Sequence, residues 1–293
     1  MSNAFRSYDL EVSGGSVIGK DHRRDGRNNQ DAYFFKQGSG YAVALVADGC
    51  GSSRYSEVGS HIAVELVGSL LLEQALRFFC GRKEEEVATM PRPLPIWERV
   101  RLDAVSNIRV LSNQMGPSLS KSVNDYFLFT LVGALITPIE SYFFSIGDGV
   151  IFVNGEMIQI GPFENNAPPY LGYEIVGSDA HSGADAFHFK VHRSLPTENL
   201  DSFLVGTDGV MSLVAAEAEF IPGKEEFVGP ISQFWNEARF FTNPQTLQRA
   251  LNLINREAVL IDWERQKVDK EKGHLPDDTT LVVGRLAPRR EGE

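Results

Sequence analysis

The chain has 293 residues, of which 42% are hydrophobic and 23% are charged. This composition is typical of a soluble globular protein with a large core, and it excludes a disordered tail and a disulfide-stabilised miniprotein. The 28 Lys and Arg against 39 Asp and Glu give a formal net charge of -11, which argues against nucleic acid as the main partner.

The cysteine content and the amino terminus indicate the compartment. Only Cys50 and Cys80 occur, too few for a disulfide framework, which predicts a cytoplasmic location. The first residues show no basic region followed by an apolar run, and no stretch approaches the roughly 18 apolar residues of a membrane helix, so we expect no membrane partner. With no repeat and no clear boundary, we expect one domain over residues 1–293, with a core at about 12–286.

The first clear unit along the chain is a strand, an acidic turn and a helix. Tyr41 to Ala47 is a nearly continuous apolar run that ends at Asp48-Gly49, which predicts a buried strand entering a turn. Helical spacing begins at Ser56, whose hydroxyl is a candidate N-cap. The apolar positions one turn apart are Val58, Ile62, Leu66 and Leu70.

A second helix follows an acidic and proline-rich segment. Residues 81–95 carry no apolar stripe and predict an exposed connection. The next periodic segment stops at Gly116-Pro117. Its apolar face consists of Val100, Ala104, Ile108, Leu111 and Met115.

The middle of the chain predicts an antiparallel meander. Its turns are expected at Asp148-Gly149 and Asn154-Gly155, because type I′ hairpin turns need positive φ at both central residues. The expected strands are residues 127–137, 141–147, 150–153 and 156–160.

The remaining segments complete an α+β pattern. We expect a strand at 203–206, a third amphipathic helix at 246–262 and a final strand at 280–285. Residues 161–193 and 210–229 have no clear pattern and predict surface loops or a flap. Strands and helices are grouped instead of alternating, which favours a layered α+β architecture over a doubly wound parallel sheet.

Aspartates stand next to apolar strands at four separated places. Asp48 and Asp208 follow strands, whereas Asp31 and the pair Asp277-Asp278 precede strands. Short carboxylates at one edge of a sheet suit hard divalent cations, and two such cations activate a water for attack on phosphorus. Each place taken singly is more often a turn, and Asp148-Gly149 is interpreted as one because of its hairpin spacing.

The ordered motifs resemble the type 2C metal-dependent serine/threonine protein phosphatases. The resemblance covers about residues 12–286. The opening Ser16 to Gly19 with His22 and the run Ala47 to Ser53 are most similar to a divergent bacterial branch. The motifs that carry it are Asn29-Gln30-Asp31, Val46-Ala47-Asp48-Gly49, Thr130, Gly147-Asp148-Gly149, Thr207-Asp208-Gly209 and Asp277-Asp278-Thr279-Thr280.

The resemblance implies an α+β fold, namely a four-layer α-β-β-α sandwich with two central, mostly antiparallel sheets. It also implies a centre of two Mn²⁺ or Mg²⁺ ions. Asp48 would bridge both ions, and the Gly49 carbonyl would bind the second. Asp208 and Asp277 would hold the first, and Asp31 would support the site through water or a hydrogen bond.

Two further site residues are expected less directly. Asp125, five residues before Thr130, falls where the family places a carboxylate for a weaker third metal. The position of the family's phosphate-binding arginine is Gly26 in this chain, so Arg27 is the expected phosphate ligand, with Arg23 and Arg24 as alternatives.

Three other positions allow more than one interpretation. Gln30 replaces a glutamate of many members, and Cys50 stands where some members carry a histidine proposed as general acid. Cys50 lacks the Cys-x5-Arg loop of thiol phosphatases, so we expect a small, partly buried residue. His22 is expected to be a hydrogen-bonded loop residue, with a ligand role as the alternative.

The leading hypothesis is therefore a metal-dependent phosphoprotein phosphatase whose partner is a phosphorylated protein, opposing a serine/threonine kinase. One alternative is a pseudophosphatase that acts as a regulatory binding module. Another is a hydrolase of small phosphate esters. The joint presence of Asp48, Asp208 and Asp277 favours an enzyme over the binding module.

Overall fold

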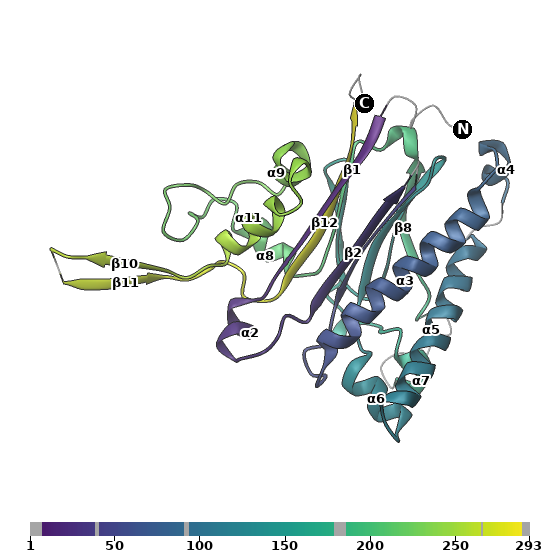
Figure 1. The fold of residues 1–293 in the computed structure, drawn as a ribbon, viewed down its shortest axis with the longest axis horizontal. Coiled ribbons are helices and arrows are strands. Elements are labelled where there is room, and N and C mark those ends of the chain that lie inside the picture. Colours follow the sequence, from purple (N-terminus) through teal and green to yellow (C-terminus); the bar gives the residue numbers. More distant parts are fainter. Residues whose placement is uncertain (1–7, 39–40, 91–93, 179–185, 265, 289–293) are drawn as a thin grey trace.

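Two five-stranded antiparallel sheets lie face to face in the computed structural model, which describes residues 8–38, 41–90, 94–178, 186–264 and 266–288 (Figure 1). The first sheet has the strand order β1-β12-β9-β6-β7, and the second has the order β2-β3-β4-β5-β8. The strands of the first sheet are β1 (Tyr8–Val17), β6 (Gly149–Val153), β7 (Glu156–Ile160), β9 (Ser202–Gly206) and β12 (Thr279–Pro288). Those of the second are β2 (Asp31–Gly38), β3 (Tyr41–Asp48), β4 (Leu131–Ile136), β5 (Glu140–Ile146) and β8 (Lys190–Pro196).

Helices cover the outer face of each sheet. The second sheet packs against α3 (Ser56–Phe79), which itself packs against α5 (Pro95–Met115). The short helices of this side are α4 (Glu84–Ala88), α6 (Leu119–Tyr126) and α7 (Tyr173–Val176). The first sheet is covered by α8 (Val210–Ala215), α9 (Gln233–Asn236), α10 (Arg239–Thr242) and α11 (Thr246–Ile254). The helix α2 (Lys20–Arg24) follows β1.

Three apolar cores separate these four layers. Along β3, alternate residues such as Ala44 and Val46 face the first sheet, whereas Val43 and Leu45 face the helices. A strand buried on both faces has no polar side, which explains the continuous apolar run at 41–47. The expected four-layer α-β-β-α sandwich with mostly antiparallel sheets is therefore confirmed.

The helix expected from Ser56 exists, but the predicted face and cap are wrong. Its fully buried side chains include Val64, Val67 and Leu71, whereas Val58 is exposed. Ser56 is the first helical residue after Tyr55, and its hydroxyl accepts a hydrogen bond from Gln30 Nε2 at 2.7 Å. The apolar stripe is wide enough to fit two neighbouring faces, and the contact with the sheet selects one of them.

The predicted meander is wrong at one of its two turns. Asn154 and Gly155 have φ of 51° and 82° and join the paired strands β6 and β7, as expected. At Asp148, however, the chain passes from β5 in the second sheet to β6 in the first. Gly147 and Gly149 have φ of 88° and 142°, so the glycines serve a crossing between sheets instead of a hairpin turn.

The predicted third helix is too long. The helix α11 ends at Ile254, and residues 258–262 form β10 (Ala258–Asp262), which pairs with β11 (Lys267–Glu271). The buried residue Asn255 ends the helix, because its side chain donates to Ile18 O and accepts from Leu275 N. The apolar, β-branched run that follows favours a strand.

The segments without a clear pattern contain short elements. The expected connection at 81–95 includes α4 with the buried residue Val87, and its residues 91–93 lie outside the described part. The stretch 161–193 contains α7 and the start of β8, and its residues 179–185 lie outside the described part. The stretch 210–229 contains α8. No helix among the described residues has the length and apolar character needed to cross a bilayer.

Candidate metal centre

The strand-end aspartates meet at one end of the two sheets. Asp31 begins β2 and Asp48 ends β3, and the two residues are directly opposite in the antiparallel pairing. In the first sheet, β9 ends at Gly206 opposite Leu281 of β12. Asp208 lies just after the end of β9, and Asp277 lies just before the start of the neighbouring strand β12.

A hydrogen bond links the two sheets at this end. The hydroxyl of Thr207, next to Asp208, donates to Oδ2 of Asp31 at 2.8 Å. The backbone N–H of Thr207 donates to Thr280 O, and Thr280 N–H donates to the Thr207 hydroxyl oxygen. Thr207 thus fixes the buried Asp31 carboxylate relative to the first sheet.

The carboxylates interact strongly with one another. Burial, followed by the charges of Asp31 and Asp208, raises the pKa of Asp48 well above its usual value. Burial and the charge of Asp278 do the same to the pKa of Asp31. Loss of solvation and the charges of Asp148 and Asp277 raise the pKa of Asp208 to about 6. The charged neighbours that dominate this end of the sandwich are all acidic, so the local field is strongly negative.

The cluster opens to solvent on one side. Asp31 is 2% exposed, Asp48 and Asp148 are partly exposed, and Asp208 and Asp277 reach solvent. The buried oxygen Oδ1 of Asp31 has no hydrogen-bond partner. A buried anionic oxygen without a donor needs a cation, a water or a proton. The donor set of several carboxylate oxygens that face solvent therefore fits a hard divalent cation.

Gly49 lies where a larger residue has no room. An added Cβ would lie 2.8 Å from Ser56 Cβ and 2.9 Å from Gln30 O. Its N–H donates to Gln30 O at 3.1 Å, and Asp48 O accepts from Thr130 N at 2.8 Å. Gln30 on one side and Thr130 on the other thus fix the backbone at Asp48 and Gly49. The motif threonine Thr130 does this through its backbone N–H.

Asp278 is a structural clamp next to the cluster. Its carboxylate accepts from Gly19 N at 2.7 Å and from Gln30 N at 2.6 Å. Nδ1 of His22 lies 3.0 Å from Asp278 Oδ2, and Nε2 of His22 lies 3.6 Å from Asp277 Oδ1. The atoms of His22, Asp277 and Asp278 also lie close enough together to hold a metal ion. His22 lies in α2 and not in a loop, and its buried Nδ1 has no hydrogen-bond partner among the described residues, so both interpretations of His22 stay predictions.

Asp148 is a site residue that the residue-by-residue interpretation missed. Its carboxylate contributes to the raised pKa of both Asp48 and Asp208, and burial raises its own pKa. The sequence does not indicate this position of Asp148, because a hairpin turn is a sufficient explanation for the dipeptide Asp148-Gly149. The flanking glycines Gly147 and Gly149 were the available signal, since both occupy positive φ at the crossing between the sheets.

Asp125 makes an ion pair on its own helix. Its carboxylate pairs with Lys121 on α6 at 2.6 Å, and its backbone oxygen accepts from Tyr55 N. Asp125 is absent from the charges that dominate the pKa shifts of Asp31, Asp48 and Asp208. The helix α6 directs this side chain along its own surface, as an i, i+4 ion pair. Its expected role as a third-metal ligand stays a prediction, which the ion pair with Lys121 does not favour.

Of the three candidate arginines, Arg27 contacts the loop after Asp48. Its Nη1 donates to Gly51 O at 3.0 Å, and its side chain is exposed. Arg24 pairs with Asp21 and Asp25, and Arg23 Nη1 lies 3.4 Å from Asn255 O. Cys50 in the same loop is partly buried against the helical core, as expected.

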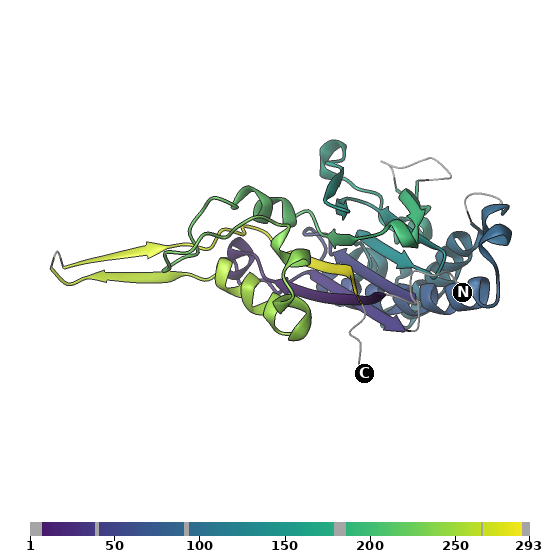
Figure 2. The ribbon, with the colours of Figure 1, turned by 90° about the horizontal axis from the view of Figure 1, so that it is seen from above.

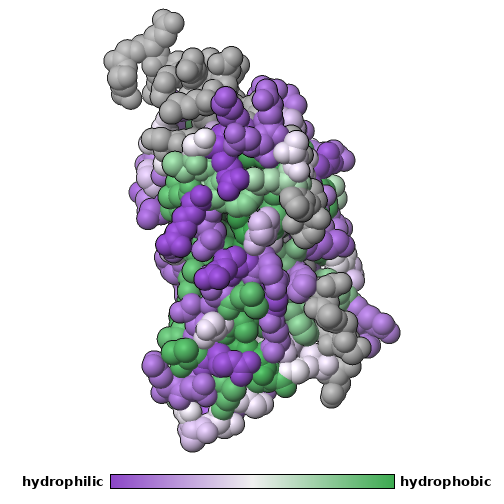
Figure 3. All heavy atoms as spheres, turned by 90° about the vertical axis from the view of Figure 1, so that its right-hand side faces the viewer, coloured by the Kyte–Doolittle hydropathy of each residue, from purple (hydrophilic) through white to green (hydrophobic). Residues whose placement is uncertain are grey.

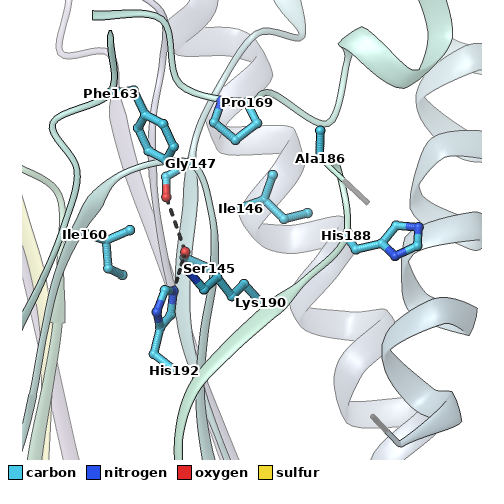
Figure 4. A pocket seen from close by; sticks show the side chains of 10 residues that line it. All are labelled: Ser145, Ile146, Gly147, Ile160, Phe163, Pro169, Ala186, His188, Lys190 and His192. Carbon is cyan, nitrogen blue, oxygen red and sulfur yellow. Dashed lines mark hydrogen bonds between the residues drawn. The ribbon is translucent and has the colours of Figure 1, made fainter. Parts of the chain in front are cut away.

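A cavity of about 300 Å³ lies beside the Asp148 crossing (Figure 4). Ile146, Ile160 and Phe163 contribute apolar walls. On its polar side, Ser145 Oγ lies 2.9 Å from His192 Nε2 and donates to Gly147 O at 3.2 Å. Burial and the nearby Lys190 lower the pKa of His192 to about 4, so this imidazole is neutral at pH 7.

The fold and the strand-end carboxylates define an α+β sandwich protein with an acidic centre that faces solvent. A family model described as protein phosphatase 2C matches residues 18–252. The chain therefore belongs to the protein phosphatase 2C family, a family of protein serine/threonine phosphatases. This confirms the resemblance drawn from the motifs. No curated protein sequence matches the chain.

Solved structures of bacterial phosphatases are similar to this chain at low identity. A bacterial serine phosphatase is 15% identical with a TM-score of 0.52, and the match covers 96% of this chain and 100% of that chain. Serine/threonine phosphatase Stp1 from Staphylococcus aureus is 16% identical with a TM-score of 0.49, covering 95% and 96%. The catalytic domain of phosphatase PstP, in complex with two manganese ions, is 15% identical with a TM-score of 0.45, covering 96% and 100%.

Proposed function

We propose that this chain hydrolyses phosphoserine and phosphothreonine monoesters in phosphoproteins, with two Mn²⁺ or Mg²⁺ ions as cofactors. The observation that supports this most is the convergence of Asp31, Asp48, Asp208 and Asp277 at one end of the sandwich, where acidic neighbours raise the pKa of Asp48 and Asp208. A phosphomonoester dianion cannot approach such a centre unless cations reverse the local charge.

Each strand-end residue has a distinct role in this proposal. Asp48 would contact both cations, the Gly49 carbonyl one of them, and Asp208 with Asp277 the other. When bound, the cations supply positive charge to the phosphate and lower the pKa of a water towards neutrality. No side-chain nucleophile is then required, which agrees with the half-buried position of Cys50.

Asp31 would position the centre without contacting the substrate. The Thr207 hydroxyl occupies its Oδ2, which leaves Oδ1 to hold a water or the proton of a water beside Asp48. Its opposite position to Asp48 in the strand pairing gives the two carboxyl groups a fixed relative orientation.

Arg27 would bind the phosphate. Gly51 O holds the guanidinium at the loop that follows Asp48, and the side chain remains exposed to an incoming substrate. A guanidinium donates two parallel hydrogen bonds to phosphate oxygens. The cavity beside the Asp148 crossing would accept a side chain of the substrate next to the phosphorylated residue.

The proposal also covers the partner, the domain organisation and the location of the protein. The partner would be a protein phosphorylated by a serine/threonine kinase that this enzyme opposes. We further propose that residues 1–293 act as one catalytic domain, because one apolar core contains residues of both sheets. The cytoplasmic location inferred from the two cysteines stays a prediction.

Phosphate release from a phosphothreonine peptide tests the proposal. We expect turnover with Mn²⁺, none with EDTA, and a loss of at least about 100-fold in Asp48→Asn, because the proposed centre would lose its shared ligand. Arg27→Ala should raise KM more than Arg24→Ala, which is the matched control. Binding of phosphopeptide without turnover under all metal conditions would instead indicate a pseudophosphatase, and turnover confined to small esters would indicate the third hypothesis.

A further inference from the structure

The cavity beside the Asp148 crossing shares a wall with the acidic centre. Gly147 lines the cavity, and the next residue, Asp148, acts through its charge on the other aspartates of the centre. Ile160 lines the cavity at the end of β7, and a Cβ added to the following residue, Gly161, would lie 2.9 Å from Asp148 Cβ. A peptide with its phosphorylated residue at the centre would therefore place a neighbouring side chain within reach of the cavity.

A bulge in the second sheet brings His192 to this cavity. In the pairing of β5 with β8, Phe143 lies opposite Arg193 and Phe144 lies opposite Val191, so His192 is the extra residue on its strand. Such bulges change the direction of a side chain, and they are common next to active sites. His192 is one of the residues that line the cavity.

The hydrogen bonds of Ser145 fix the tautomer of His192. Ser145 is 3% exposed, and its Oγ donates its one hydrogen to Gly147 O at 3.2 Å. Nε2 of His192, 2.9 Å from the same Oγ, must then be the protonated ring nitrogen. Figure 4 shows His192, Ser145 and Gly147 in this order along the two hydrogen bonds. Because the ring is neutral at pH 7, Nδ1 keeps a lone pair, to which none of the described residues donates.

The rest of the lining combines apolar walls with one cation. Lys190 lies opposite Ser145 in the strand pairing, close enough to His192 that its charge lowers the pKa of the ring. No carboxylate occurs among the lining residues that the structure describes. Apolar walls with a few placed polar groups are typical of a ligand pocket, and here these groups are one acceptor and one ammonium. The walls are formed by Ile146, Ile160, Phe163 and Pro169.

We propose that this cavity binds the side chain of a tyrosine that lies near the phosphorylated residue of the substrate, an inference that rests on the proposed function. The phenol ring would lie between the apolar walls. Its hydroxyl would donate to Nδ1 of His192 and accept from the ammonium of Lys190, because a phenol oxygen can do both. His192 and Lys190 are thus specificity residues and take no part in the hydrolysis.

Other side chains complement the cavity less well. A phenylalanine would bury the Nδ1 acceptor of His192 without a donor, which is unfavourable. An indole N–H can donate to Nδ1 but cannot accept from Lys190. A glutamate could pair with Lys190, but it would place its carboxylate beside the lone pair of Nδ1 and against the apolar walls. A basic side chain would be repelled by Lys190.

Other exposed apolar residues lie outside the cavity. The strands β10 and β11 carry exposed residues such as Val268 and extend away from the sandwich in both views (Figures 1 and 2). On the outer side of the helical layer, hydrophobic and hydrophilic residues are interspersed (Figure 3). His61 is an exposed residue of α3 in this layer and does not line the cavity. His61→Leu is therefore the matched control for His192→Leu.

Turnover of phosphothreonine peptides tests the specificity. Each peptide carries one tyrosine, phenylalanine, tryptophan or glutamate in an alanine background, at successive positions on either side of the phosphothreonine. With Mn²⁺, tyrosine at one of these positions should give a kcat/KM about three- to tenfold above that of phenylalanine, as expected for one hydrogen bond. His192→Leu should abolish this difference, whereas His61→Leu should keep it. Circular dichroism verifies folding, and Lys190→Met, which should reduce the preference, serves as the second variant.

Binding of p-cresol tests the cavity without turnover. In the presence of Mg²⁺, p-cresol should shift the NMR signals of Ser145 and His192, and it should bind about three- to tenfold more tightly than toluene, which lacks the hydroxyl. His192→Leu should remove this advantage, and His61→Leu should not.

The two measurements separate this proposal from the function on which it rests. Turnover without a preference for tyrosine, a preference for glutamate, or a tyrosine preference that persists in His192→Leu overturns the proposal. So does p-cresol that binds no more tightly than toluene. If p-cresol binds through His192 but no peptide is hydrolysed, the proposed function is wrong, and with it the assignment of the occupant to a phosphoprotein substrate.

Discussion

Asp31 and Asp48 lie directly opposite each other where β2 begins and β3 ends, and burial raises the pKa of both carboxyl groups. Two neighbouring carboxylates cannot both be charged at low cost unless a cation or a proton lies between or beside them. The pairing of two strands thus creates the electrostatic problem that a divalent cation would resolve, and this relationship underlies the first prediction.

The variant Asp48→Asn should have opposite effects with and without metal. In EDTA at pH 7, the neutral amide removes a charge that the fold disfavours, so the unfolding free energy should equal or exceed that of the wild type, by an amount on the order of 1 kcal/mol. Mn²⁺ should raise the Tm of the wild type by several degrees but not that of the variant. A variant that is less stable in EDTA yet gains as much from Mn²⁺ would contradict the account.

The contact between Thr207 and Asp31 should matter for stability. Thr207→Val removes the hydroxyl that donates to the buried Asp31 carboxylate and leaves an acceptor unsatisfied. We expect a loss of about 1 to 3 kcal/mol in urea unfolding. Thr207→Ser keeps the hydroxyl and should recover most of that loss. Equal losses in the two variants would show that keeping the hydroxyl does not preserve stability, which would contradict this role of the hydrogen bond.

Substitution of Asp148 should lower the affinity for Mn²⁺, whereas substitution of Asp125 should not. Asp148→Asn removes a carboxylate whose charge raises the pKa of Asp48 and Asp208, so it should weaken Mn²⁺ binding by about tenfold in a calorimetric titration. Asp125→Asn breaks only an exposed ion pair with Lys121 and should leave that affinity unchanged. The reverse order would support the original assignment of Asp125 to a third metal.

His192 should lower stability in acid. Its folded pKa of about 4 lies below the usual 6.5, so the unfolded chain binds more protons between these values. Stability therefore rises with pH across this window and falls as the pH drops from about 6.5 to 4. Because the ring is half-buried, we expect the share of His192 to be roughly 1 to 2 kcal/mol. In His192→Asn, the loss between pH 7 and pH 5 should shrink by a measurable part, and an unchanged loss would refute this assignment.

Much of the fold was predictable because two periodicities are strong in this sequence. The apolar run of β3 next to Asp48 and the turn Asn154-Gly155 both follow from local rules. The end of α11 was not predictable in this way, because β10 is a strand only through its pairing with β11. The covered face of α3 likewise depends on the neighbouring sheet, which sequence spacing does not contain.

In the candidate site, too, some residues follow from local sequence rules and others depend on tertiary structure. Asp31, Asp48, Asp208 and Asp277 were predictable because each stands at the end of a strand, and the sheets bring strand ends together. Asp148 was not, since its dipeptide fits a local turn and only the passage between the sheets places it with the others. Asp125 was expected on spacing alone, and its helix directs it to Lys121.

Anomalous scattering from a crystal soaked in Mn²⁺ tests the central claim, that the strand-end aspartates form a cation site. The account predicts two peaks, one shared by Asp48 with the Gly49 carbonyl and one shared by Asp48, Asp208 and Asp277. A Mn²⁺ ion bound only by His22, Asp277 and Asp278, or no ion at this end of the sandwich at saturating Mn²⁺, would contradict it.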